Sequence, residues 1–196
     1  MRIDKLTTSF QQALGAAQSV AVGKDNANLD PLHVLHALIK EDEFGAKSLL
    51  LRSGGNVNKL HQLVDDAIEK LPKLNNPSGE LSASSDLQRI FNLIDKEAQR
   101  RGDDFIASDL FLYILCEDKC AAGKLMHQTG LSKKNLGAAL DYIRGGKSQN
   151  SPEQKQDSDT ISKYMIDVTE KAEAGGLDPV IGRDDEIRRC IQILQR

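Results

Sequence analysis

The sequence predicts an all-α protein built from two copies of a four-helix module. Its apolar content comes mainly from Leu, Ile, Val and Ala, with 4% aromatic residues and no Trp among 196 residues, and this mix suits packed helices better than a sandwich or barrel. Apolar residues recur every three or four positions between residues 4 and 143, which places them on helix faces. The same faces and glycine stops then occur a second time, which indicates a duplication.

The first module contains four predicted helices. We expect the first over residues 4–22, ended by Gly23, because its apolar residues share one face. The second has Asp30 as its N-cap and Pro31 at its first helical position. The third passes through residues 49–51 to a stop at Gly54 and Gly55, and the fourth carries Leu60, Val64, Ala67, Ile68 and Leu71 before Pro72.

The second module follows a polar connector and repeats the first. Its first helix is expected to be capped by Ser84 or Ser85. Sliding the chain by 77 residues, with small gaps later, lays residues 10–14 on 87–91, 31–38 on 108–115, Gly54 on Gly130, and Val64, Ala67, Ile68 and Leu71 on Leu136, Ala139, Leu140 and Ile143. We therefore expect two modules packed about a pseudo-twofold axis, as one eight-helix domain over residues 1–144.

The chain changes character after residue 144. Residues 145–159 contain Gly, Ser, Gln and charged side chains without an apolar residue, and we expect a flexible linker there. A helical segment is expected to resume over residues 160–176. A final helix face carries Ile187, Cys190, Ile191 and Leu194 without an apolar partner elsewhere in the chain. We interpret residues 160–196 as the start of a further, incomplete domain.

Residues 145–148, with the sequence GGKS, resemble the end of a phosphate-binding loop. Such a loop needs a glycine five places before Gly146, where this chain has Asp141, and it needs a strand before it and a helix after it. Here a predicted helix precedes the stretch and a polar linker follows. The sequence therefore predicts no complete nucleoside-triphosphate site.

The cysteines and histidines do not form a recognisable metal motif. Cys116 and Cys120 lie one helical turn apart with only His127 near them in sequence, whereas a structural zinc site has four ligands. Cys116 also aligns with Ile39 of the first module, so we expect buried packing. His33 and His36 lack nearby carboxylate or thiol ligands in sequence, and we expect surface or half-buried side chains. No metal site is predicted.

Charge and targeting signals limit the classes of partner and the compartment. A net charge of -3 provides no electrostatic footprint for nucleic acid or an anionic membrane. The first ten residues carry charges at positions 2, 4 and 5, and no later stretch approaches about 18 uninterrupted apolar residues. Three cysteines without disulfide spacing fit a reducing compartment. We expect a cytoplasmic protein with neither nucleic-acid nor membrane partners.

Several stretches resemble a known family. They are MRIDKLTTSFQQAL at the start, DPLHVLHAL at 30–38, RRGDDFI at 100–106, IRGGK at 143–147 and YMIDVTEKAEAGGLDPVIGRDDEIRR at 164–189. Over the whole chain the sequence resembles the amino-terminal region of the Clp family of AAA+ ATPases, in particular its bacterial disaggregases. The duplicated helices resemble the Clp amino-terminal domain, and the last segment resembles the entry to the first ATPase domain.

The resemblance implies an ATP-driven homohexameric ring that threads aggregated polypeptides through its pore together with the DnaK system. ATP and magnesium are its implied cofactors, and a long coiled-coil middle domain and the phosphate loop would follow Arg196. We therefore expect residues 1–196 alone to be monomeric, free of cofactor and non-catalytic. The implied adenine pocket includes Val180 and Ile181, with Gly182 at the turn.

Comparison of the two modules suggests where a substrate surface lies. Leu110 aligns with His33, Tyr113 with His36, and Leu93 with Ala16. Where a position is apolar in only one of the two copies, two explanations are open. It belongs either to an exposed apolar patch with a polar rim, which is typical of surfaces that bind unfolded polypeptide, or to the packing between the modules.

The family resemblance adds functional polar positions at Thr7, Asp103 and Asp109, where Asp109 replaces the usual Glu. From the residues alone, Thr7 lies near a helix start and Asp103 at a turn, so both have ordinary structural roles available. The hypothesis is that Thr7, Leu93, Asp103, Asp109 and Leu110 share one surface groove, with Tyr113 as a further substrate-binding residue.

Three functions remain open. The first is a substrate-capture and regulatory module of a stress-response disaggregase. The second is an adaptor-docking module of a protease-associated unfoldase of the ClpA or ClpC type. The third is a spacer or regulatory cap without a direct ligand.

Overall fold

The computed structural model describes residues 3–41, 45–73, 81–145, 148–152 and 183–194. The chain divides into two units, Met1–Gln156 and Asp157–Arg196, and each is considered by itself. The elements of the first unit are a 3-10 helix at Ile3–Lys5, α1 (Thr8–Gly23), β1 (Asn28–Leu29), α2 (Pro31–Lys40), α3 (Ala46–Arg52), α4 (Val57–Glu69), β2 (Ser82–Ala83), α5 (Ser85–Arg101), α6 (Ser108–Glu117), α7 (Ala121–Gln128) and α8 (Lys133–Arg144).

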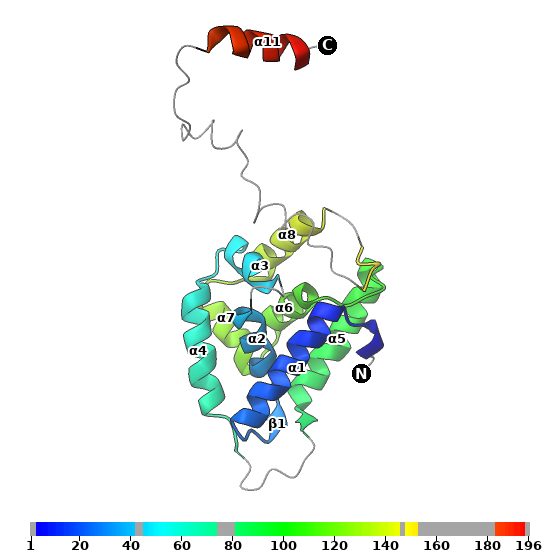
Figure 1. Cartoon of the computed structure of the whole chain (residues 1–196). Coiled ribbons are helices and arrows are strands. Elements are labelled where there is room, and N and C mark those ends of the chain that lie inside the picture. The colour runs from blue at the N-terminus through cyan, green and yellow to red at the C-terminus, as the bar shows by residue number, and fades with distance from the viewer. Residues whose placement is uncertain (1–2, 42–44, 74–80, 146–147, 153–182, 195–196) are drawn as a thin grey trace. The chain divides into compact units, whose positions relative to one another are not determined.

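The two predicted modules are present as α1–α4 and α5–α8 (Figure 1). The all-α fold class and the duplicated four-helix architecture are thereby confirmed. Asp30 caps α2 as expected, since its carboxylate accepts a hydrogen bond of 3.0 Å from the Leu32 backbone N–H. Of the two candidate caps for α5, Ser84 is the one used, and its hydroxyl accepts from the Leu87 N–H at 3.2 Å.

Two short parallel pairings join the modules in a symmetric way. Leu29 pairs with Ala83 in the two-residue sheet, and Leu6 forms an isolated parallel bridge with Ile106. These pairs exchange under the 77-residue offset, because Leu6 corresponds to Ala83 and Leu29 to Ile106. The segment before the first helix of each module is therefore held by the segment before the second helix of the other.

The helix contacts and the glycine stops follow the same symmetry. Helix α3 packs against α8, and α4 packs against α7. Gly54 and Gly130 both adopt left-handed backbone, with φ of 81° and 88°, a conformation that glycine takes without the steric cost of a Cβ. The aligned glycine stops therefore mark the same backbone turn in both modules.

Helices α2 and α6 form the centre of the first unit (Figure 1). Every residue from Pro31 to Ile39 is buried, and α6 is buried from Ser108 to Cys116 except at Tyr113. Three aromatic rings, one each from α1, α5 and α6, pack together with centroid distances of 5.6 to 6.3 Å; they belong to Phe10, Phe91 and Phe111. The two modules thus share one hydrophobic core.

Both histidines of α2 are buried, so the expectation of surface or half-buried side chains was wrong. His33 accepts a hydrogen bond at Nδ1 from the Asp30 N–H at 3.0 Å, and its Nε2 lies 2.9 Å from Asn26 Oδ1. Burial lowers the pKa of His33 to about 4. The polar side chain is tolerated because both ring nitrogens find partners.

Cys116 and Cys120 are buried free thiols, as the packing interpretation predicted. Burial raises the pKa of each thiol to about 11, which keeps both protonated at neutral pH and opposes metal binding through thiolate.

In the second unit the structure describes α11 (Asp184–Leu194), which agrees with the predicted final helix. Arg183 Nη1 lies 3.1 Å from Glu186 Oε1 at its start. The predicted helix at 160–176 and the adenine-pocket residues Val180, Ile181 and Gly182 lie outside the described residues. No helix in the described ranges combines the length and apolar character that crossing a membrane requires.

We predict that two glycine-to-alanine substitutions change stability in opposite directions. A Cβ on Gly123 would lie 2.2 Å from the Asp118 carbonyl oxygen and 2.6 Å from that of Leu115, so Gly123→Ala should lower the free energy of unfolding by about 1–3 kcal/mol. Gly15→Ala meets nothing within 4 Å and should raise it by about 0.5–1 kcal/mol. Denaturant titration of both variants tests this prediction. A Gly123→Ala protein with the same free energy of unfolding as the wild type would contradict it.

We also predict that His33 stays neutral in the folded protein at pH 5.5. The unfolded chain takes up this proton near pH 6.5, whereas the folded state does so only near pH 4. The unfolded state therefore binds more protons between these values, and the free energy of unfolding falls as the pH is lowered through them. Imidazole ¹⁵N shifts report the charge directly, and a titration midpoint near 6.5 would contradict the prediction.

Candidate functional site

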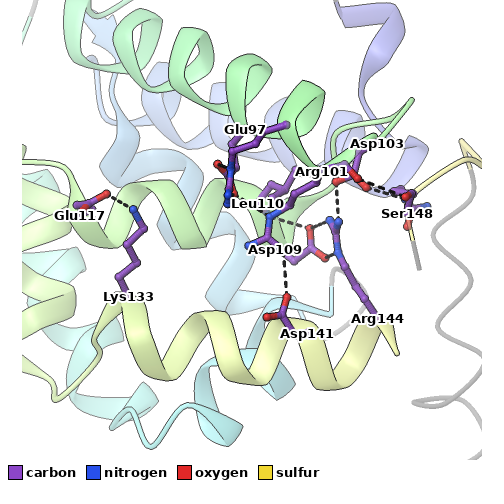
Figure 2. A network of polar contacts seen from close by, with 12 residues as sticks. Glu97, Arg101, Asp103, Asp109, Leu110, Glu117, Lys133, Asp141, Arg144 and Ser148 are labelled. Carbon is purple, nitrogen blue, oxygen red and sulfur yellow. Dashed lines mark hydrogen bonds and ion pairs between the residues drawn. The ribbon is translucent and has the colours of Figure 1, made fainter. Parts of the chain in front are cut away.

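A buried ion-pair network joins the loop after α5, the first turn of α6 and the last turn of α8 (Figure 2). Arg144 donates from Nη1 to Asp103 Oδ2 at 2.6 Å. It also donates from Nε and Nη2 to the two carboxylate oxygens of Asp109, each at 2.8 Å. This bidentate geometry is the strong form of an Arg–carboxylate contact.

The network is well shielded from water. The side chains of Asp103, Arg144 and Asp109 are 0%, 9% and 11% exposed. Burial alone would lower the pKa of Arg144, but hydrogen bonds and charge from Asp109 and Asp103 outweigh it, so the pKa is raised. Arg144 is a single cation facing two carboxylates, and backbone N–H groups help to stabilise the excess negative charge. The Gln149 N–H donates to Asp103 Oδ1 at 2.8 Å, and the Leu110 N–H donates to Asp109 Oδ1 at 2.6 Å.

The same network holds the start of the predicted linker against the domain. The Gln149 carbonyl accepts 3.0 Å hydrogen bonds from the N–H groups of Asp104 and Phe105, and the Thr8 N–H donates to the Pro152 carbonyl at 3.0 Å. Residues 148–152, which belong to the segment 145–159 predicted as a flexible linker, thus make backbone hydrogen bonds to the domain. The polar composition of this segment does not rule out docking, because the contacts use backbone groups that every residue carries.

Tyr113 lies beside this network between two cations. The Arg101 guanidinium carbon is 4.9 Å from its ring centroid and Lys133 Nζ is 5.2 Å from it, both within the range of cation–π contacts. Arg101 is itself bound by Glu97 at 2.8 Å and Asp141 at 3.1 Å. Tyr113 is thus half-buried and contacts two cations.

A separate groove of about 730 Å³ lies between α5, the end of α6 and the loop before α7. We call it the Leu93 groove; its lining residues are Asp86, Arg89, Leu93, Lys96, Glu97, Arg100, Ile114, Glu117, Asp118, Lys119 and Cys120. Leu93 is 40% exposed, while Ile114 and Cys120 are buried beneath it. The groove therefore has an apolar floor and a charged rim.

Charges on the rim pair with one another. Arg89 binds Asp86 at 2.6 Å and Asp118 at 2.6 and 3.1 Å. Hydrogen bonding from Arg100, reinforced by Arg101, holds the pKa of Glu97 at about 2. Because both signs are present and largely paired, the groove has no field that would select a strongly charged ligand.

The hypothesis of one groove shared by Thr7, Leu93, Asp103, Asp109 and Leu110 was wrong. Leu110 and Thr7 are fully buried, and Leu93 alone of the five is substantially exposed. The difference between Leu110 and His33 therefore marks core packing, the alternative that sequence comparison left open. Helix α6 is covered on nearly all sides, so amphipathic periodicity cannot identify an outward face on it.

Thr7 occupies the N-cap position of α1, yet its side chain makes no capping hydrogen bond. Its backbone N–H donates to the Ile106 carbonyl at 2.9 Å, and its buried Oγ1 has no partner among the described residues. Ser84, the equivalent residue of the second module, does cap its helix. Thr7 thus joins the two modules through its backbone.

Sequence reasoning missed Arg144, Ile114, Arg89 and Asp118. Arg144 is separated from its partners by 35 and 41 residues, so no local pattern links them. Ile114 does leave a signal, because its equivalent in the first module is Ala37, just as that of Leu93 is Ala16. Two positions at which the second module has a larger apolar residue than the first, Leu93 and Ile114, thus line the same groove.

Comparison with known proteins identifies the family of the chain. The family model described as the Clp repeat (R) N-terminal domain matches residues 5–129. The chaperone protein ClpB of Pseudomonas putida is 43% identical over 196 residues, and that of Vibrio cholerae is 41% identical over the same length. Each match covers 100% of this chain and 23% of the relative, so the chain spans less than a quarter of their length.

Solved structures with a similar fold include the Hsp104 N-terminal domain from Candida albicans. It has a TM-score of 0.68 and 24% identity and covers 78% of this chain and 99% of its own. The N-terminal domain of the ClpV1 ATPase from E. coli has a TM-score of 0.61 and 18% identity, covering 78% and 91%. These matches agree with the Clp resemblance carried by the sequence motifs.

We predict that Arg144→Ala destabilises the domain by about 3–5 kcal/mol, because it leaves two buried carboxylates without their cation. Arg100→Ala is the matched control: Arg100 is 68% exposed in its pair with Glu97, and its loss should leave the free energy of unfolding nearly unchanged, because exposed ion pairs contribute little to stability. Denaturant titration measures both, and faster amide exchange at residues 104 and 105 should accompany the first. Equal stabilities of the two variants would contradict the structural role of Arg144.

Proposed function

Since the chain belongs to the family of Clp repeat N-terminal domains, we propose that it is the substrate-capturing and regulatory domain of a ClpB-type chaperone. The observation that carries the proposal is the Leu93 groove, where an exposed leucine lies over an apolar floor. An apolar patch with a polar rim suits unfolded or aggregated polypeptide, which presents apolar side chains that folded proteins bury.

The rim supports weak and general recognition rather than one sequence. Its charges of both signs are paired within the domain, so a bound polypeptide would not need a particular charge to compensate them. The apolar contact then provides most of the binding free energy, in proportion to the area that it buries. This is the behaviour that a domain capturing many different substrates requires.

Within a full-length ClpB-type protein, our proposal extends to a homohexameric, cytoplasmic ATPase that works with the DnaK system. ATP and magnesium would be held by the ATPase domains, with Val180, Ile181 and Gly182 contributing to an adenine pocket. The support is the ClpB name of relatives that match over the whole chain and the motif in residues 175–196. Because these relatives carry the chaperone name, we favour substrate capture over adaptor docking or a spacer role.

We predict that Leu93→Gln weakens binding of an unfolded model polypeptide about fivefold to tenfold, equivalent to about 1–1.4 kcal/mol of lost apolar contact. Leu51→Gln is the control, because Leu51 is 59% exposed on α3 outside the groove. It should bind within a factor of two of the wild type. Fluorescence anisotropy with a labelled, permanently unfolded polypeptide measures the affinities, and denaturant titration verifies that both variants are folded.

Backbone amide shifts provide a second and independent reading. Addition of the polypeptide should move the amide signals of Leu93, Ile114 and residues 117–120, which line the groove. If Leu93→Gln binds as tightly as the wild type and these signals stay in place, substrate capture by the groove is refuted.

A further inference from the structure

Three potential metal ligands meet on the first module, away from the Leu93 groove. His36 comes from α2, while His61 and Asp65 lie one turn apart on α4, which packs against α2. His36 Nε2 is 3.1 Å from Asp65 Oδ1, and His61 Nδ1 is 3.1 Å from Asp65 Oδ2. The ligand atoms all lie within 4.8 Å of one another.

These separations are close to those of a tetrahedral zinc site. Metal–ligand distances of about 2.0–2.2 Å place neighbouring ligand atoms about 3.3 Å apart. The two 3.1 Å contacts reach different oxygens of Asp65, so the side chains have to rotate for one oxygen to serve as the ligand. The ligand atoms lie within 4.8 Å of one another, and the widest separation has to shrink by at most about 1.5 Å. His61 and Asp65 are 35% and 39% exposed, which leaves their side chains room to rotate.

Access and protonation are also compatible with a metal. The exposed sides of His61 and Asp65 provide an entry path and a place for a water ligand, while His36 is anchored in the core. His36 Nδ1 has no hydrogen-bond partner among the described residues. In the metal-free protein Asp65 Oδ1, 3.1 Å from Nε2, favours the proton on Nε2. Metal binding at Nε2 requires the tautomer with the proton on Nδ1, which leaves Nε2 free to act as the ligand.

We propose that His36, His61 and Asp65 form a binding site for one divalent transition-metal ion of the zinc class, which would clamp α2 to α4. Two imidazoles and a carboxylate suit Zn²⁺, Co²⁺ or Ni²⁺, whereas Mg²⁺ and Ca²⁺ prefer all-oxygen sites. Two nearby lysines, Lys40 and Lys24, oppose positive charge at His36. Lys24 forms an ion pair with Glu69 at 2.5 Å, and this pairing reduces the repulsion between Lys24 and a bound cation.

The second module provides an internal comparison. Under the alignment of the two modules, His36, His61 and Asp65 correspond to Tyr113, Lys133 and Gly137. The structure brings these three together as well: Lys133 Nζ lies 5.2 Å from the Tyr113 ring centroid, and a Cβ on Gly137 would meet Tyr113 at 3.3 Å. The same location thus holds a cation–π contact in one module and three potential metal ligands in the other.

The test is a titration of the whole chain with zinc chloride. Isothermal titration calorimetry measures the affinity and the stoichiometry, and NMR of the histidine side chains identifies the ligands. We expect one zinc ion per chain, perturbed His36 and His61 signals, and a rise in melting temperature from preferential binding to the folded state. His61→Gln and Asp65→Asn should each weaken binding at least about tenfold and abolish the rise in melting temperature. Magnesium should produce none of these effects.

Two control substitutions distinguish this site from binding elsewhere. His127→Gln and Cys190→Ser remove the remaining histidine outside α2 and α4 and the exposed thiol, and both variants should bind zinc like the wild type. Zinc binding that survives His61→Gln and Asp65→Asn overturns the proposal, as does an absence of binding at zinc concentrations of about 100 µM. Denaturant titration of the metal-free variants verifies that they are folded.

Discussion

The fold depends on two central helices, α2 and α6, that have almost no solvent-facing side. Each is buried along nearly its whole length, and a single four-helix module offers too few partners to cover such a helix. Packing two modules about a pseudo-twofold axis lets each central helix complete the core of the other module. The crossed backbone pairings of Leu6 with Ile106 and of Leu29 with Ala83 fix the relative position of the modules.

Within this nearly symmetric scaffold, the chemically distinctive features occur once each. Leu93 and Ile114 make a groove where the first module has Ala16 and Ala37. The histidines of α2 and α4 likewise have no counterpart in α6 and α8. Duplication preserves the positions that build the core, and the remaining positions are free to differ. Differences between aligned positions therefore point to a candidate site when at least one neighbouring member of the cluster is exposed, as Leu93 is beside Ile114 and His61 beside His36.

Two of the polar residues highlighted by the Clp resemblance belong to the buried ion-pair network. Asp103 and Asp109 bind Arg144 and help to hold residues 148–152 against the domain. These contacts hold residues 148–152 in place, so Asp103 and Asp109 contribute to structure without contacting a ligand. The strength of the network follows from burial, since the same charges on the surface would contribute little.

The helices, the cap at Asp30, the glycine stops, the duplication and the Clp resemblance could be predicted from the sequence, because each depends on residues a few positions apart or on direct alignment. The cap of α5 was narrowed to Ser84 or Ser85, and the structure identifies Ser84. The burial of Leu110, His33 and His36, the ion pairs of Arg144 with Asp103 and Asp109, and the contacts of residues 148–152 with the domain could be found only from the packed structure. Burial and ion pairing depend on side chains tens of residues away in sequence. Local periodicity describes which face a residue occupies, whereas the packing of the other module decides whether that face meets water.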